Sequence, residues 1–189
     1  MIEIEVRGQL DKRGYEKLKD FLAKNGRFLG HKEREMYLLR GHPGHSHDPT
    51  AREMDIRLRN TDGECEIMFK RKAGDKNIGR EEISLKLKDK NLEIAKRAVK
   101  ALGYANAIKM HRIMDQYQYE NIHWQIVRTP KDYFYFEAEQ ETENEGDVEK
   151  IHAALAEKAR SVGLTVLTPE ETRDFLFLLD REVNEEVAF

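Results

Sequence analysis

The sequence predicts an α+β domain in which eight mostly antiparallel strands form a barrel and helices pack outside it. About eight segments have strand patterns, and helical segments stand between and after them. Closing such a sheet leaves no strand edge exposed, which favours a barrel. A chain of 189 residues has the size of one domain, so we expect a single domain over residues 1–189.

The first half of the chain alternates between strand and helix signals. Residues 2–7 read as a strand, and residues 11–25 read as a helix that Asp11 caps and Gly26 ends. Four further strands are predicted here, at 32–40, 53–60, 64–72 and 79–87. The glycine- and proline-containing stretch 41–49 predicts a loop between the first two of these.

The second half begins with a helix over 91–102, which Gly103 closes. Strands are then predicted at 109–119, 122–127 and 132–141. Two C-terminal helices follow within about 148–187, the second starting after the cap residue Thr168, and we expect both to pack on the barrel.

Composition excludes several classes of protein. A net charge of -3 argues against a general nucleic-acid binder, and the lone Cys65 rules out an internal disulfide. No basic-then-apolar leader and no run of membrane-spanning length is present. We therefore expect a cytoplasmic protein with neither a membrane nor a nucleic acid as partner.

Five predicted strands carry charge on one face and apolar side chains on the other. In the first, Glu3, Glu5 and Arg7 alternate with Ile and Val. The matching faces of the others hold Asp55, Arg57 and Arg59; Glu66, Met68 and Lys70; Arg80, Glu82 and Ser84; and Tyr135, Glu137, Glu139 and Glu141. One such strand is typical of an ordinary solvent face. Five together, beside helices that need apolar faces to pack on, predict charges that point into the barrel.

These charges also sort by sign along the chain. The end strands supply the acids Glu3, Glu5, Glu137 and Glu139, and the middle strands supply the bases Arg57, Arg59, Lys70 and Arg80. Clustered carboxylates suit a hard divalent cation, and clustered Arg and Lys suit phosphate oxygens. The pattern predicts a metal ion and several phosphates as cargo, although the charges could instead only pair with one another.

The ordered motifs resemble the CYTH superfamily, the triphosphate tunnel metalloenzymes, over nearly the whole chain. The matching residues are Glu3, Glu5 and Arg7; Arg57 and Arg59; Lys70; Arg80 and Glu82; Lys109 and Arg112; and Glu137 and Glu139. The chain departs from the family pattern at Arg7, where the family has lysine, and near Val127 and Arg128, where it has a metal-binding aspartate.

The resemblance implies metal-dependent hydrolysis of a small-molecule triphosphate inside the barrel. Metal ligands for Mg²⁺ or Mn²⁺ would be Glu3, Glu5, Glu137 and Glu139, with Glu82 in support. Phosphate would be bound by Arg7, Arg57, Arg59, Lys70, Arg80, Lys109 and Arg112, and the catalytic set would be Glu3, Glu5, Arg57, Arg59 and Lys70. Two alternatives stay open: an adenylyl cyclase of class IV type, and a protein that binds triphosphate without turnover.

Two other features are open in the sequence. The loop histidines His42, His45 and His47 lack the usual zinc spacing, so a loop near the tunnel mouth is the simpler interpretation. Phe175 and Phe177 in the last predicted helix could pack on the barrel or form the face of a homodimer.

Overall fold

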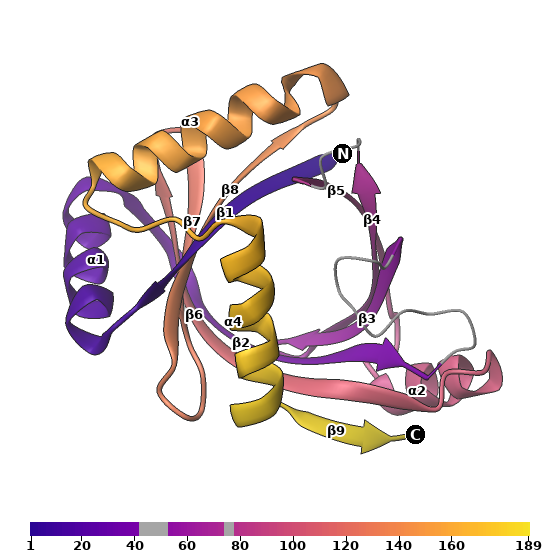
Figure 1. Ribbon diagram of the computed structural model, residues 1–189. Coiled ribbons are helices and arrows are strands. Elements are labelled where there is room, and N and C mark those ends of the chain that lie inside the picture. Colours follow the sequence, from indigo (N-terminus) through magenta and orange to yellow (C-terminus); the bar gives the residue numbers. More distant parts are fainter. Residues whose placement is uncertain (42–52, 74–77) are drawn as a thin grey trace.

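The computed structural model describes residues 1–41, 53–73 and 78–189, and Figure 1 shows their arrangement. Its strands are β1 (Ile2–Leu10), β2 (Arg27–Arg40), β3 (Met54–Thr61), β4 (Glu64–Ala73), β5 (Gly79–Lys86), β6 (Asn106–Tyr119), β7 (Ile122–Arg128), β8 (Phe134–Thr142) and β9 (Glu185–Ala188). Its helices are α1 (Lys12–Asn25), α2 (Leu92–Ala101), α3 (Val148–Ser161) and α4 (Pro169–Glu182), with a 3₁₀ turn at Glu145–Asp147.

All nine strands belong to one sheet in the order β2-β3-β4-β5-β1-β8-β7-β6-β9. Every neighbouring pair is antiparallel. The long strands β2 and β6 also pair with each other, from Arg27 opposite Gln118 to Arg40 opposite Asn106. This pairing closes eight of the strands into a ring and confirms the predicted fold class.

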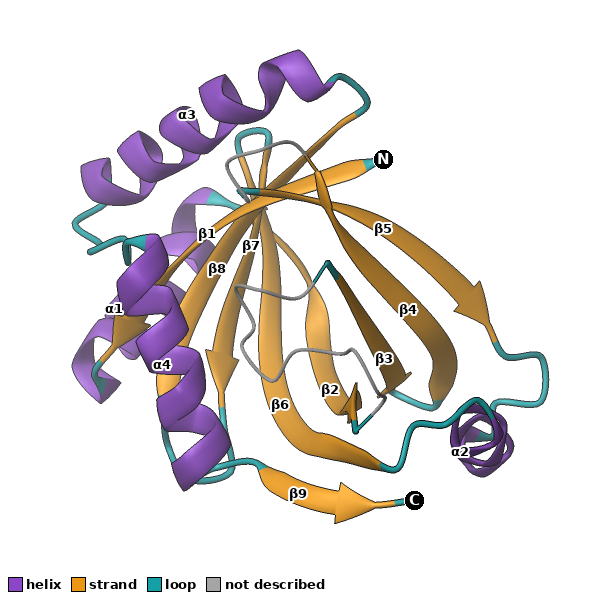
Figure 2. Cartoon of the chain, turned by 45° about the vertical axis from the view of Figure 1, so that its right-hand side comes forward, coloured by secondary structure: helices purple, strands orange, loops and turns teal. Residues whose placement is uncertain are grey.

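Helices α1, α2 and α3 lie outside the ring (Figure 2), and they cover apolar faces of the strands. α1 and α3 pack on the apolar side chains of β1, β7 and β8, around the fully buried Trp124 and Phe136. α2 packs on the outer faces of β3 and β4 through Leu92, Ala95 and Val99. Because side chains alternate along a strand, the charged faces are left to point into the ring.

Helix α4 lies in a different place from the other three. Phe175 and Leu179 pack against Met114, Val127 and Tyr135, whose side chains belong to the inner faces of β6, β7 and β8. A capping box between Thr168 and Glu171, with proline at the first position, fixes where α4 begins. In Figure 1, α4 crosses in front of the opening of the ring beside β1 and β8. It therefore covers part of one end of the interior.

The C-terminal residues form a strand where the sequence suggested helix up to about residue 187. β9 pairs with β6 over residues 106–109, next to the segment of β6 that β7 occupies. The last residue is fixed as well, since the Phe189 N–H donates to the Ala105 carbonyl at 2.9 Å. Residues 185–188 form a strand because β6 has a free edge there to pair with, and this edge cannot be recognised from the local sequence.

The ring is closed unevenly. β1 pairs with β8 over nine residue pairs but with β5 over only three, from Ile2 opposite Glu81 to Ile4 opposite Gly79. β5 continues past this seam to Lys86 while still paired with β4. None of the helices in the described ranges has the length and apolar character needed to cross a membrane.

Candidate functional site

An acidic wall forms where β1 and β8 lie side by side. Their register sets Glu5 opposite Glu139 and Arg7 opposite Glu137, all on the inner face. Carboxylate oxygens of Glu3, Glu5 and Glu139 lie within 4.8 Å of one another. This is a ligand set of the hard oxygen donors that Mg²⁺ and Mn²⁺ prefer.

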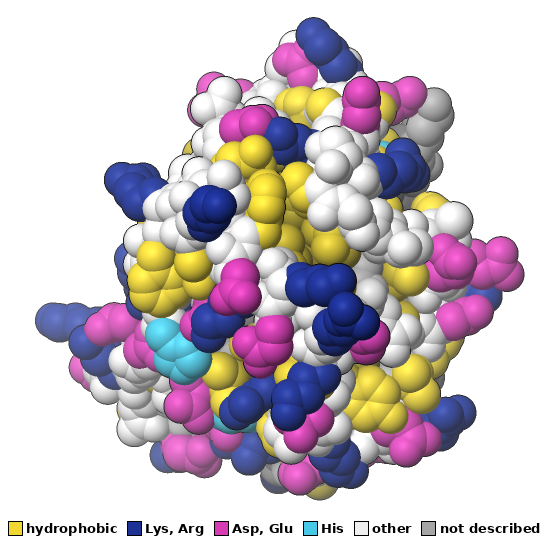
Figure 3. All heavy atoms as spheres, turned by 90° about the vertical axis from the view of Figure 1, so that its left-hand side faces the viewer, with side chains coloured by type: hydrophobic (Ala, Val, Ile, Leu, Met, Phe, Trp, Pro, Cys, Tyr) yellow, Lys and Arg dark blue, Asp and Glu magenta, His cyan; other side chains and the backbone are white. Residues whose placement is uncertain are grey.

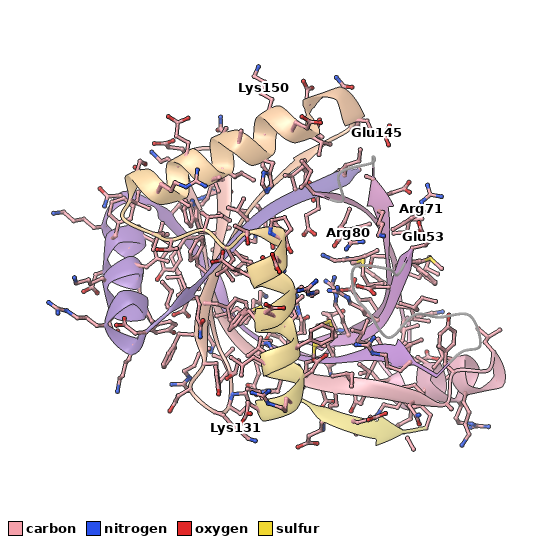
Figure 4. All side chains as sticks on the ribbon, viewed as in Figure 1. Glu53, Arg71, Arg80, Lys131, Glu145 and Lys150 are labelled. Atoms are coloured by element: carbon pink, nitrogen blue, oxygen red, sulfur yellow. The ribbon has the colours of Figure 1, made fainter. Side chains whose placement is uncertain are left out.

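A basic wall faces it from β3, β4 and β5. The register sets Arg57 opposite Met68 on β4 and Lys70 opposite Glu82 on β5, again on the inner face. In Figure 4, Arg80 lies on the inner side of the ring and Arg71 on its outer side. The predicted basic residues of these three strands are therefore brought together.

Ion pairs connect the two walls. Lys70 Nζ lies 2.6 Å from a Glu3 oxygen and also contacts Glu82. Arg7 contacts Glu5 and lies 3.1 Å from Glu137. Arg7 therefore neutralises acids of its own wall, and Lys70 bridges to the opposite one.

Two guanidinium groups of the basic wall keep unused donors. The buried Nε atoms of Arg57 and Arg59 have no hydrogen-bond partner among the described residues. Other atoms of these groups are engaged, with Arg57 3.1 Å from Asp55 and Arg59 3.5 Å from Glu66. A buried donor without an acceptor is costly, so these two groups are suited to an anionic ligand.

The pKa values of Glu3 and Glu5, two acids on the same face of β1, are shifted in opposite directions. Burial raises the pKa of Glu3 to about 9, with Lys70 opposing and Glu139 and Glu5 reinforcing the rise. Burial would also raise the pKa of Glu5, yet the charges of Arg7 and Lys70 bring it down to about 2. Burial therefore favours the protonated form of Glu3, while the cations around Glu5 favour its ionised form.

Two arginines of the basic wall have lowered pKa values. Burial and the nearby charges of Arg34 and Arg57 lower the pKa of Arg59 to about 10. Burial, and to a smaller extent Arg57, also lowers the pKa of Arg80. Bound anionic charge would relieve this repulsion.

One predicted phosphate ligand, Lys109, lies outside the ring. Its Nζ is 3.0 Å from Glu35 and lies over the aromatic side chain of Tyr37, on the outer face of β2. Its predicted companion Arg112 does lie inside, donating to the Tyr135 hydroxyl at 3.1 Å and to Asn184 at 3.0 Å. The structure therefore brings Arg112 to the site and leaves Lys109 out, because the two are three positions apart and alternate positions of a strand face opposite ways.

Sequence reasoning missed two inner residues of β7. Gln125 donates to Glu139 at 2.7 Å, and His123 Nδ1 lies 3.1 Å from the other oxygen of the same carboxylate. Val127, where an aspartate was sought, stands opposite Tyr135 and away from the acids. The alternation with Trp124, a core residue, was the signal that places His123 and Gln125 inside. The loop histidines His42, His45 and His47 lie outside the described residues.

A pocket of about 450 Å³ opens beside the acidic wall. It is lined by Glu3, Gln118, Asn121, His123, Glu139, Gln140 and Glu141. It lies at the end of the ring that carries the β6–β7 turn, the start of β1 and the end of β8, away from α4. Amides and carboxylates meet there, so the lining offers both hydrogen-bond donors and acceptors.

Figure 3 shows one outer face of the molecule, where acidic and basic side chains are interspersed. Balanced mixing of this kind matches the small net charge of -3.

Comparison with solved structures places the fold. PH1819 from Pyrococcus horikoshii OT3 superposes with a TM-score of 0.76 at 16% identity, covering 93% of this chain and 98% of that one. A "putative adenylate cyclase" from Vibrio parahaemolyticus gives 0.68 at 13% identity, covering 93% and 98%. A Hippeastrum "putative adenylyl cyclase", described as revealing a dominant triphosphatase activity, gives 0.55 at 14% identity, covering 95% and 94%.

This chain has the fold of these proteins. At these identities the comparison shows the fold and nothing beyond it. No protein-family model matches the chain, and no curated protein matches its sequence. With identities this low, the chemistry of the chain has to be argued from its own residues.

Proposed function

We propose that this chain is a metal-dependent triphosphatase that binds its substrate inside the strand ring. The observation that carries the proposal is the pair of facing walls, with Glu3, Glu5 and Glu139 on one side and Arg57 and Arg59 on the other. A triphosphate complexed with a divalent cation is a ligand that satisfies both walls at once. The activity described for the Hippeastrum protein of the same fold is in keeping with it.

The donor set fits a hard divalent cation. The three carboxylates present oxygens close enough to share one ion, and Gln125 and His123 hold that of Glu139 in place. Glu3, Glu5 and Glu139 would hold Mg²⁺ or Mn²⁺, and Glu137 lies next to this cluster, paired with Arg7. When bound, such an ion supplies positive charge to phosphate oxygens and a Lewis acid for the attacking water.

The basic residues would grip the phosphates and stabilise the negative charge that develops on them. Arg57 and Arg59 would direct their free Nε donors at phosphoryl oxygens. Lys70 would exchange Glu3 for a phosphate oxygen, because Glu3 would be engaged as a ligand. Arg80 would add charge from β5, so that the leaving diphosphate is stabilised from several strands.

A cyclase that makes cyclic AMP from ATP is the second candidate. The pocket beside the acidic wall favours it, because Gln118, Asn121 and Gln140 offer amides to a group attached to the phosphates. In that reaction a ribose hydroxyl, in place of water, would attack the α-phosphate and pyrophosphate would leave. The same pocket would serve an organic triphosphate in hydrolysis, so only the products separate the two reactions.

The test is phosphate release from tripolyphosphate, ATP and thiamine triphosphate, with Mg²⁺ and separately with Mn²⁺. The ATP reaction is also assayed for cyclic AMP. Glu139→Gln, which removes one carboxylate ligand, is compared with Glu81→Gln. Glu81 lies on the outer face of β5 and pairs with Arg71, so its replacement alters charge without altering the interior.

Hydrolysis predicts metal-dependent phosphate release that falls sharply in Glu139→Gln and persists in Glu81→Gln. Formation of cyclic AMP and pyrophosphate from ATP would identify the protein as a cyclase and contradict the triphosphatase assignment. If calorimetry detects tripolyphosphate binding but no product forms, the protein binds triphosphate without turnover. Absence of both product and binding would contradict the assignment of the two walls to a triphosphate.

A further inference from the structure

Strand β5 is paired differently along its two edges. β4 pairs with it from Gly79 to Lys86, whereas β1 pairs with it only from Gly79 to Glu81. One further contact, from the Glu82 N–H to the Met1 carbonyl at 3.4 Å, ends the seam. Within residues 1–41, 53–73 and 78–189, no strand pairs with this edge beyond that point. Figure 2 shows the rest of β5 at the margin of the molecule with its outer edge open.

The backbone groups on the open edge can be identified. The Leu87 N–H donates to the Cys65 carbonyl on the β4 side, at 2.8 Å, and the Glu82 N–H points to the β1 side. Successive N–H groups of a strand alternate between its two edges. Ser84 and Lys86 therefore present their N–H and C=O groups to the open edge.

Apolar side chains accompany this edge on the outer face. Ile83 and Leu85 are each 53% exposed. Natural sheets usually protect a strand edge with charged side chains, proline, a bulge, or a helix or loop laid over it. In the described chain the stretch from Ile83 to Lys86 has only the charge of Lys86 at its end, so its backbone groups remain open to another strand.

We propose that this edge pairs with the same edge of a second copy of the chain, in a two-fold symmetric antiparallel dimer. If Leu85 faces its own counterpart across the axis, Ser84 of each copy faces Lys86 of the other. The free N–H and C=O groups then meet as hydrogen-bonded pairs, and the two Leu85 side chains touch on the outer face.

The charge pattern of the strand supports a second copy as the occupant. The start of β5 carries the acids Glu81 and Glu82, and its end carries Lys86, followed by Lys88. Antiparallel pairing brings the acidic half of one copy toward the basic half of the other. In this register Glu82 of each copy comes opposite Lys88 of the other, whereas a parallel arrangement would place each of these charges beside its own kind.

Removal of one edge donor tests the pairing. Ser84→Pro deletes an N–H of the open edge and leaves the β4 side intact, because the Ser84 N–H does not point to β4. Ser84→Ala is the matched control, since it removes the hydroxyl and keeps the N–H. Mass is measured by light scattering across a wide range of protein concentration, with the circular dichroism melt of each variant as the check on folding.

A cross-link provides a second test that needs no loss of stability. Leu85→Cys would place two thiols opposite each other in a non-hydrogen-bonded pair, a spacing that a disulfide can bridge. Ile94→Cys is the control, because Ile94 is equally exposed, at 55%, but lies on α2. The native Cys65 is buried and serves as background in both variants.

The expected result is twice the mass of one chain for the wild type and Ser84→Ala, a single-chain mass for Ser84→Pro, and a covalent dimer for Leu85→Cys alone. A single-chain mass for the wild type at all concentrations would overturn the proposal. So would a dimer that survives Ser84→Pro, or one lost in Phe177→Asp instead, since Phe177 is 44% exposed on α4. These readouts do not depend on any catalytic activity.

Discussion

Replacement of Glu3 by glutamine is expected to flatten the pH dependence of stability in the metal-free protein. Glu3 lies in the ring 2.6 Å from Lys70, and burial raises its pKa to about 9, against an ordinary value of 4.5. Glutamine keeps the shape and can still accept the Lys70 hydrogen bond. It carries no proton to lose, so the variant isolates one titration.

The sign follows from the direction of the pKa shift. Between the unfolded value of 4.5 and the folded value of about 9, the folded state holds a proton that the unfolded chain has lost. The stabilisation is complete below the lower value and disappears as the pH rises through the upper one. One proton corresponds to about 1.4 kcal/mol per pH unit, or about 3–5 °C in melting temperature for a domain of this size.

The assay is thermal unfolding between about pH 5 and pH 9 in the presence of a chelator. The wild type should lose stability as the pH rises, and Glu3→Gln should show a clearly smaller slope. Glu81→Gln, on the outer face, should keep the wild-type slope. Equal slopes for the wild type and Glu3→Gln would refute the reasoning, because Glu3 would then not be the group that holds the proton.

Three further predictions concern the site and its support. Lys70→Met should lower tripolyphosphate affinity in calorimetry by about 10- to 100-fold through loss of a charge-assisted contact, whereas Lys109→Met should leave it unchanged; equal losses would place Lys109 back in the site. Gln125→Leu should weaken Mn²⁺ binding by about 10-fold because Glu139 loses the donor that orients it, and Gln116→Leu, one step further away at 3.4 Å from Gln125, should have a smaller effect. Gly8→Ala should lower the free energy of unfolding in urea by about 1–3 kcal/mol, since a methyl group there would lie 2.0 Å from the Thr165 carbonyl oxygen and 2.4 Å from the Phe136 ring. An unchanged free energy of unfolding would mean that the segment around Thr165, between α3 and α4, packs loosely on β1.

The period of two along the strands was enough to predict most of the inner face. Glu3, Glu5, Arg57 and Arg59 alternate with core residues, so their common direction follows from strand geometry alone. The same rule applied strictly would have excluded Lys109. It would also have found Gln125, which must point away from its neighbour Trp124.

Other parts of the structure depend on contacts that local sequence does not carry. The apolar stripe of α4 predicts a buried face, but it does not say that the surface beneath is the inner side of β6, β7 and β8. β9 forms because β7 leaves part of β6 open. The pairing of β2 with β6 joins segments that lie far apart in the chain, and the residue pattern of neither segment identifies its partner.

The pairing of β1 with β8 also sets the order in which the molecule can assemble. β3, β4 and β5 follow one another closely and can pair as soon as they exist, but β1 has its long partnership with β8, near the other end of the chain. Pairings of such large sequence separation form late and slowly. Glu5 and Glu139 meet only through that pairing, so the carboxylate cluster comes into existence at the step that completes the fold. A ligand held by that cluster would then slow unfolding, since β1 and β8 could not separate without first releasing it.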